Sequence, residues 1–177
     1  VVSELVTIVD DGAKPGGIAS APFDGEGVPT QKTVLVDSGK LQGFMYNSYT
    51  AAKDGVSSTG NGARGSFQSP PQLGSSNFYV APGKGFQEAI INETGEGFYL
   101  TEVMGMHTAN PISGDFSLGA AGIWIHNGEL TTPVRGMVIA GNILELLAGV
   151  DAVGSDLRFF AGRGAPTVRV ANLTVSG

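Results

Sequence analysis

The chain has 177 residues, 41% of them hydrophobic, which suits one globular domain or one large half-domain. Its net charge is −6, whereas a duplex-DNA binder normally carries a basic face. The same charge argues against binding to an anionic membrane surface. It has no cysteine, no apolar run near the roughly 20 residues that span a bilayer, and no signal-peptide pattern. We therefore expect a cytoplasmic protein without thiolate metal ligands or membrane segments.

The first part of the chain predicts short strands joined by turns. Glu4–Val9 alternates weakly and predicts a strand. Thr33–Val36 and Leu41–Tyr46 flank the turn-forming Asp37-Ser38-Gly39-Lys40, a pattern typical of a β-hairpin. Asp54–Gly74 is rich in Gly, Ser and Pro and predicts a long flexible loop. Because the chain opens directly in a strand-like segment and does not begin with methionine, we expect it to be a fragment.

Two short helices are expected. Apolar residues at helical spacing predict the first over residues 85–94, before Gly95. The second follows Asn142, which has Glu145 three residues later in a capping arrangement, and Gly149 ends it. Both helices are brief interruptions in a chain that otherwise predicts strands.

The second half of the chain predicts longer strands. Phe98–Met104 is one, and Ala121–Arg135 forms a hairpin around Asn127-Gly128, with the Trp124 face expected to be core. Thr167–Val175 predicts a strand with a bulge midway, where its alternation changes phase. The fold class expected for residues 1–177 is a single, mainly β or α+β domain, with antiparallel, sandwich- or barrel-like sheets, hairpins and two short helices.

No motif in the chain specifies catalysis. Gly60-x-Gly62-x-x-Gly65 matches the dinucleotide pattern but lacks its strand and helix, so a mobile glycine loop is favoured. His107 and His126 lie in no metalloprotease helix motif and are favoured as packed or rim residues. Asp24 and Glu26 suggest a calcium loop only weakly, because the ligand spacing of an EF-hand is absent.

Several blocks, in order along the chain, carry a family resemblance. They are Gly17–Thr30 with its Pro22-Phe23-Asp24-Gly25-Glu26-Gly27-Val28, Gly39–Ala52, Ser58–Gly62, Glu96–Asn142 and Val153–Val170. Together they resemble the TldD/PmbA family, also called modulator of DNA gyrase. The resemblance covers nearly the whole chain.

The resemblance implies a subunit with an N-terminal α/β half, absent from this chain, and a β-rich C-terminal half. TldD-type members carry a His-Glu-x-x-x-His helix and a late cysteine that form a zinc peptidase centre for extended peptides. PmbA-type (TldE-type) members lack these ligands and pair with TldD. The resemblance also implies a cytosolic complex linked to microcin maturation and antitoxin turnover. With no cysteine here and Phe160–Pro166 at the late-ligand region, the chain resembles the C-terminal domain of a PmbA-type subunit.

We therefore expect a non-catalytic scaffold that lines a peptide groove, with no cofactor of its own and zinc in a TldD-type partner. The partner is expected to be that subunit or a second copy in a dimer, with peptide as substrate and neither nucleic acid nor membrane bound. Candidate groove residues are Asp24, Glu26, Glu102, His107 and Asp115. The alternative for these side chains is that they tie loops together. Alternative functions are a divergent stand-alone metallohydrolase and a β-sandwich ligand-binding module.

Overall fold

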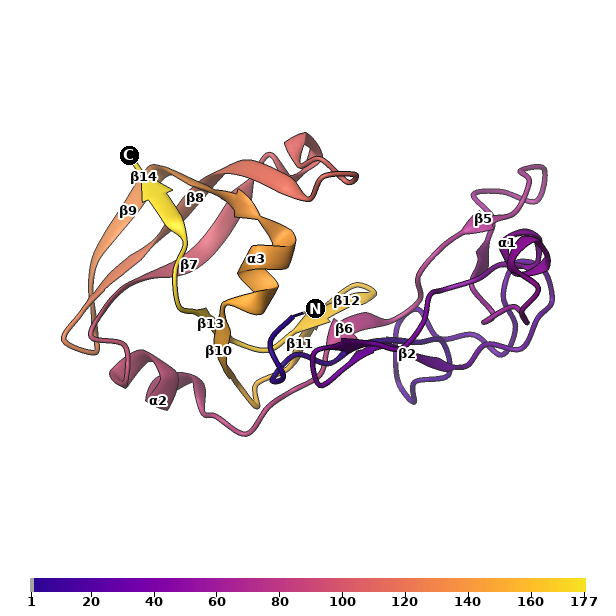
Figure 1. The fold of residues 1–177 in the computed structure, drawn as a ribbon, viewed down its shortest axis with the longest axis horizontal. Helices are drawn as coiled ribbons and strands as arrows, with labels where there is room; N and C mark the ends of the chain where they lie inside the picture. Colours follow the sequence, from indigo (N-terminus) through magenta and orange to yellow (C-terminus); the bar gives the residue numbers. More distant parts are fainter. Residues whose placement is uncertain (1) are drawn as a thin grey trace. The chain divides into compact units, whose positions relative to one another are not determined.

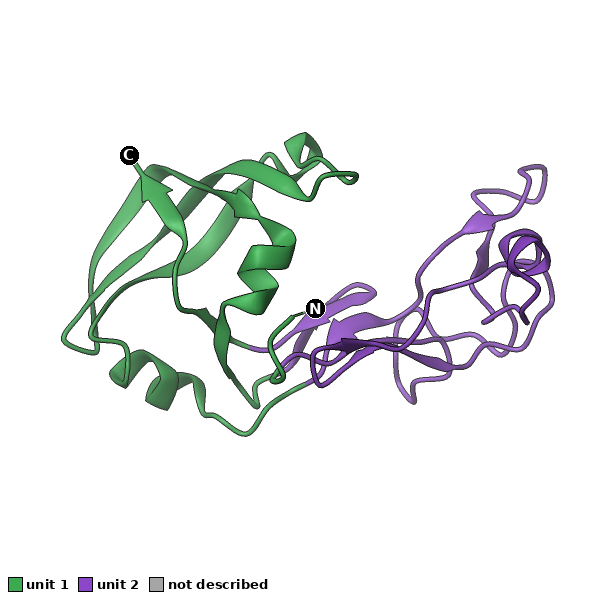
Figure 2. Ribbon diagram, in the orientation of Figure 1, with its two compact units in different colours: residues 1–5, 82–156, 167–177 green, residues 6–81, 157–166 purple. Residues whose placement is uncertain are grey.

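A computed structural model describes residues 2–177, which form two compact units (Figure 2). Unit 1 comprises the N-terminus up to Leu5, Pro82–Asp156 and Thr167–Gly177. Unit 2 comprises Val6–Ala81 and Leu157–Pro166. Each unit is therefore assembled from separate stretches of the sequence.

Unit 2 contains a six-stranded sheet in the order β11-β12-β6-β1-β2-β3. Its strands are β1 (Ile8–Asp11), β2 (Lys32–Asp37), β3 (Lys40–Leu41), β6 (Phe78–Val80), β11 (Arg158–Phe160) and β12 (Arg163–Ala165). Neighbouring strands are antiparallel except β12 and β6, which are parallel. The predicted strand at residues 4–9 is thus real, but it begins and ends later in the chain.

The predicted hairpin at residues 37–40 is confirmed. Ser38 and Gly39 have φ angles of 46° and 78°, the positive values that a two-residue hairpin turn requires. The returning strand is shorter than expected, however, because β3 ends at Leu41. Residues 42–47 have no regular structure. The backbone N–H of Tyr46 donates to the Thr59 hydroxyl instead of pairing with a neighbouring strand.

A third helix, α1 (Ser48–Asp54), was not predicted. Asn47 caps it, because its side chain accepts from Thr50 N at 2.9 Å while Thr50 Oγ1 accepts from Asn47 N at 3.1 Å. Gly55 ends the helix with a φ of 68°. The prediction of two helices is therefore wrong by one, and the cap residues on both sides were the signal that could have found it.

The interior of unit 2 holds a network of buried polar side chains beside its apolar ones. Asp10, on β1, is 1% exposed. Its carboxylate accepts from the backbone N–H of Ser76 at 2.7 Å, the Ser76 hydroxyl at 2.9 Å and the side-chain amide of Asn61 at 2.7 Å. Asn77 is also fully buried, and its amide donates to the Asp11 carbonyl and the Ser20 hydroxyl. These bonds join β1 to two segments distant in sequence.

Unit 1 contains a four-stranded antiparallel sheet in the order β14-β9-β8-β7 (Figure 1). The strands are β7 (Glu96–Met104), β8 (Asp115–His126), β9 (Glu129–Asn142) and β14 (Thr174–Ser176). The predicted turn between β8 and β9 is confirmed, since Asn127 and Gly128 have φ angles of 53° and 79°. The strands around it are longer than expected.

One face of this sheet holds the apolar core of the unit. Leu118, Ala120 and Ile139 are buried there against a wider set of apolar side chains: Phe98, Val103, Phe116, Met137, Leu173 and Val175. Trp124 packs on Phe98 with ring centroids 5.1 Å apart but remains 37% exposed. The expectation that Trp124 is core is therefore wrong: its neighbour Ile125 is 5% exposed, and it is the Trp124 side of β8 that becomes exposed near the hairpin.

The other two helices match the prediction. They are α2 (Gln87–Asn92) and α3 (Ile143–Ala148), with Asn142 capping α3 through Leu144 N. Ile90 of α2 is buried, and Gln87 donates to the Tyr99 hydroxyl of β7 at 2.6 Å. The helix therefore packs on the sheet of unit 1.

The prediction of one continuous last strand is wrong. Residues 167–175 form two strands, β13 (Val168–Val170) and β14, in different sheets. β13 pairs with β10 (Val150–Val153), whereas β14 pairs with β9. Between them, Ala171 N bonds the Gly149 carbonyl, so the phase change marks a switch of sheet and not a bulge.

The predicted fold class is confirmed: the structure is β-rich α+β with mainly antiparallel sheets. Over residues 2–177 no sheet closes into a barrel. In the same part of the chain, no helix has the length and apolar character to cross a membrane.

The Asp10 carboxylate yields a stability prediction. Asp10→Asn replaces one accepting carboxylate oxygen with an N–H₂ group, which then faces another hydrogen-bond donor. We therefore expect the free energy of unfolding, measured by urea denaturation, to fall by about 2–4 kcal/mol. Asp37→Asn, an exposed aspartate in the same sheet, is the control and is expected to change stability by less than about 0.5 kcal/mol. Equal effects of the two substitutions would contradict the structural role of Asp10.

Candidate functional site

The loop that carries Asp24 docks on the glycine-rich segment of unit 2. Asp24 Oδ1 accepts from the backbone N–H groups of Glu26 and Val28, both at 2.9 Å. Its Oδ2 accepts from Gly62 N at 2.8 Å, and Gly25 N donates back to the Gly62 carbonyl at 2.6 Å. The carboxylate thus closes its own turn and fastens it to residue 62.

Glu26 belongs to the same arrangement. Its Oε2 accepts from Ser48 N, the first residue of α1, at 2.7 Å. Arg64 donates through Nε to the Gly25 carbonyl and through Nη1 to the Ser69 carbonyl, both at 2.7 Å. One acidic loop therefore holds the start of α1 and the segment that contains β4 (Gly62–Ala63) and β5 (Gln72–Leu73).

This docking explains the glycine pattern at residues 60–65. A Cβ on Gly62 would lie 2.6 Å from Glu26 Oε2 and 2.9 Å from Asp24 Oδ2. Gly60, with a φ of +73°, would place a Cβ 2.5 Å from the Pro29 carbonyl oxygen. The first two glycines are therefore needed for close packing against the loop of residues 24–30. The glycine pattern thus serves this packing and not the binding of a phosphate.

Asp115 lies at the start of β8 in unit 1 and closes a different loop. Asn142 Nδ2 donates to Asp115 Oδ1 and to the Ser113 carbonyl, both at 2.9 Å. Ser113 Oγ accepts from Asp115 N at 3.3 Å. The hydrogen bond from Asn142, and after it the one with Ser113, lowers the pKa of the Asp115 carboxyl below its usual value, against a small opposing effect of burial.

Glu102 and His107 are exposed in unit 1. Glu102 lies on β7 opposite Ala121, and His107 lies in a short 3₁₀ turn, η1 (Met106–Thr108). Among residues 2–177 neither side chain has a hydrogen-bond or ion-pair partner. Both are therefore free surface groups in the structure.

The five predicted groove residues do not form one cluster. Asp24 and Glu26 come together in unit 2, while Glu102, His107 and Asp115 belong to unit 1. For Asp24, Glu26 and Asp115 the contacts fit the alternative that they tie loops together.

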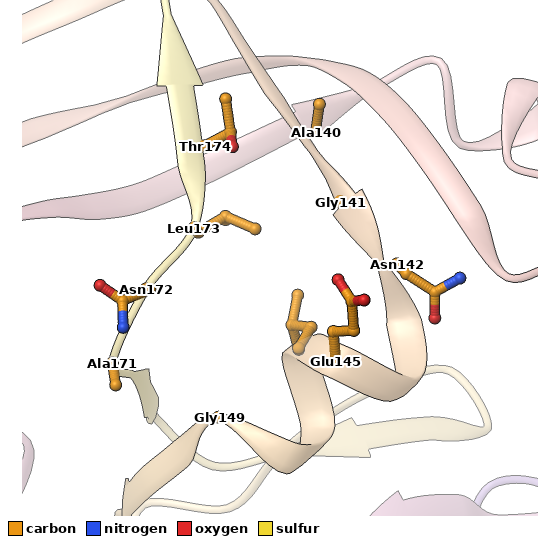
Figure 3. A pocket seen from close by; sticks show the side chains of 10 residues that line it. Ala140, Gly141, Asn142, Glu145, Gly149, Ala171, Asn172, Leu173 and Thr174 are labelled. Atoms are coloured by element: carbon orange, nitrogen blue, oxygen red, sulfur yellow. The ribbon is translucent and has the colours of Figure 1, made fainter.

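Sequence reasoning missed a hollow of about 450 Å³ in unit 1 (Figure 3). It lies between the end of β9, α3 and the segment that leads into β14. The residues that line it are Ala140, Gly141, Asn142, Glu145, Leu146, Gly149, Ala171, Asn172, Leu173 and Thr174. Two of these residues, Asn142 and Glu145, form the capping pattern in the sequence, but that pattern indicates the start of a helix and not a hollow.

β7 forms one edge of the sheet of unit 1: it has 9 residues and pairs only with β8 in the described part of the chain. On the opposite side, β14 has 3 residues and pairs with residues 138–140 of β9. Backbone N–H and C=O groups along such an edge are available to an added strand. A bulge between Leu100 and Glu102 divides the edge into two parts.

Zinc chemistry needs three or four converging donors. Within residues 2–177 no group of three or more His, Cys, Asp or Glu side chains could hold a metal ion. Among residues 2–177, these donors do not come together as a complete set of zinc ligands.

Comparison with known proteins decides the family. Residues 1–177 match the model of the PmbA/TldA metallopeptidase C-terminal domain. The chain belongs to the PmbA/TldD family. Metalloprotease PmbA of Escherichia coli O157:H7 is 33% identical over the whole of this chain. A protein from Buchnera aphidicola (Acyrthosiphon pisum) named as a metalloprotease TldD homolog is 32% identical over the same span.

Solved structures of the family agree with the fold. A Thermotoga maritima protein described as a candidate modulator of a DNA gyrase superposes with a TM-score of 0.91 at 40% identity over 99% of this chain. TldE from Thermococcus kodakarensis gives a TM-score of 0.91 at 32% identity over 99% of the chain. The chain spans 37% of the E. coli relative's length and 40% of the chain in each of these two structures.

The glycine packing of this family member yields a prediction. Gly62→Ala is expected to lower the free energy of unfolding by about 1–3 kcal/mol, because the new methyl group collides with the Asp24 and Glu26 carboxylates. Gly65→Ala, whose Cβ would have its nearest neighbour 3.9 Å away, is the matched control and should change stability by about 0.5 kcal/mol or less. Thermal and urea unfolding measure both, and similar losses for the two variants would refute the docking account.

A second prediction concerns the Asp115 carboxyl. Because folding lowers its pKa, it stabilises the fold above its unfolded pKa, and this contribution disappears as pH falls through the folded pKa. Carboxyl NMR titration should show the pKa of Asp115 rising in Asn142→Ala and rising less in Ser113→Ala, since the Asn142 bond is the larger cause. An unchanged pKa in Asn142→Ala would contradict the assignment.

Proposed function

We propose that this chain is the non-catalytic C-terminal domain of a PmbA-type subunit, which lines a peptide groove and holds a TldD-type partner or a second copy. The observation that carries the proposal is the long free edge of β7 in a family whose relatives are named metalloproteases. An extended peptide that pairs with this edge gains backbone hydrogen bonds whatever its sequence.

The donor set of the chain supports a role without catalysis. The sequence has no cysteine, and residues 2–177 bring no three metal donors together. Zinc and hydrolysis are therefore assigned to a TldD-type partner. The same observation disfavours a stand-alone metallohydrolase within this chain.

Co-purification tests the assignment of roles. The natural-length protein that contains these residues is purified alone and with a TldD-type subunit from the same cell, and zinc content and cleavage of an unfolded peptide are measured on each sample. We expect both zinc and cleavage only when the TldD-type subunit is present. Zinc-dependent cleavage by the natural-length protein alone would overturn the proposal.

Hydrogen exchange tests the groove. An extended peptide added to the complex is expected to slow amide exchange in residues 96–104 severalfold, because an added strand protects edge amides. β14, the short opposite edge, is the internal control and should exchange unchanged. Binding of the peptide without protection of β7 would exclude this edge as the groove.

A further inference from the structure

The hollow beside α3 has a single charged lining residue, Glu145. In Figure 3 its carboxyl group points into the hollow, and Leu173 extends into it from the opposite wall, while the amide of Asn142 is directed away. The exposed Glu145 shares this lining with the apolar side chains of Ala140, Leu146 and Leu173. The hollow's volume of about 450 Å³ falls within the range of small-molecule sites.

The Glu145 carboxylate is not used by the fold. Glu145 is the third residue of α3, the position from which a capping-box side chain reaches back to the cap residue. In α1 the equivalent Thr50 makes that bond to Asn47. In α3 Asn142 caps Leu144 N, but within the described residues Glu145 has no hydrogen-bond or ion-pair partner.

From this geometry we propose that the hollow is a binding site for an organic cation, an alkylammonium or guanidinium group on a short aliphatic stem. The carboxylate would accept charge-assisted hydrogen bonds from the cationic head. The stem would lie along Leu146 and Leu173 and remove apolar surface from water. No lysine, arginine or histidine lines the hollow to compete for the carboxylate.

Other ligand classes fit less well. An anion would meet the Glu145 carboxylate without a compensating cation. Calcium or magnesium prefers six or more oxygen ligands, and the hollow offers one carboxylate. A wholly apolar ligand would desolvate that carboxylate without giving it a partner.

This inference does not depend on the proposed function, because it concerns only side chains within unit 1. The cationic group has two sources with the same chemistry. One is a lysine or arginine side chain of a peptide, and the other is a free amine. The probes are chosen to distinguish them.

Calorimetric titration of the natural-length protein at low salt tests the site. The probes are N-acetyl-arginine amide, its uncharged citrulline analogue of nearly equal shape, and agmatine as a free amine. We expect the arginine amide or agmatine to bind and the citrulline analogue to bind about tenfold more weakly or worse, because it lacks the charge. Tighter binding of the arginine amide points to a peptide side chain, and tighter binding of agmatine points to a free amine.

A matched pair of variants locates the binding. Glu145→Gln is expected to weaken the preferred probe by about tenfold. Glu88→Gln removes the same charge from the first turn of α2, outside the hollow, and should change affinity less than about twofold. Both glutamates are exposed, so both variants should fold, which circular dichroism verifies. Absence of saturable binding, equal binding of the citrulline analogue, or equal effects of the two variants would overturn the proposal.

Discussion

Unit 2 depends on one buried carboxylate, that of Asp10. Its three donors come from Ser76 and Asn61, so β1, the glycine-rich segment and the entry to β6 share a single anchor. All the buried polar residues of the described chain lie in this unit: Asp10, Asp11, Asn47, Asn61 and Asn77. Because buried polar groups are costly unless bonded, this network specifies one arrangement of irregular loops more sharply than apolar contacts could.

Unit 1 is specified differently. Its core is apolar, built on one face of a long antiparallel sheet. Because this core is apolar, polar groups at its margin are not needed to hold the unit together. The two proposed binding features lie at that margin: the edge of β7 and the hollow that contains Glu145. Under the two proposals above, unit 1 offers the binding surfaces, while the acidic loop of unit 2 serves the architecture.

Local chemistry made part of this structure predictable. The turns at Ser38-Gly39 and Asn127-Gly128 and the cap at Asn142 depend on neighbouring residues only, so the sequence indicates them correctly. The switch of residues 167–175 between two sheets depends on partners distant in the sequence. The sequence alone therefore predicts a bulge at that point. The candidate site was least predictable, because Asp24 meets Gly62 only after folding and Glu145 shows its free carboxylate only once the hollow exists around it.

The interleaving of the two units bears on synthesis of the chain. In unit 2, β12 pairs in parallel with β6, so residues 163–164 complete a sheet whose other central strands were made much earlier. Until they leave the ribosome, the edge of β6 stays open to wrong partners, while unit 1 likewise waits for residues 167–177. Neither unit can be released by a single cut in the chain, and neither can be completed before residues 163–177 have been made.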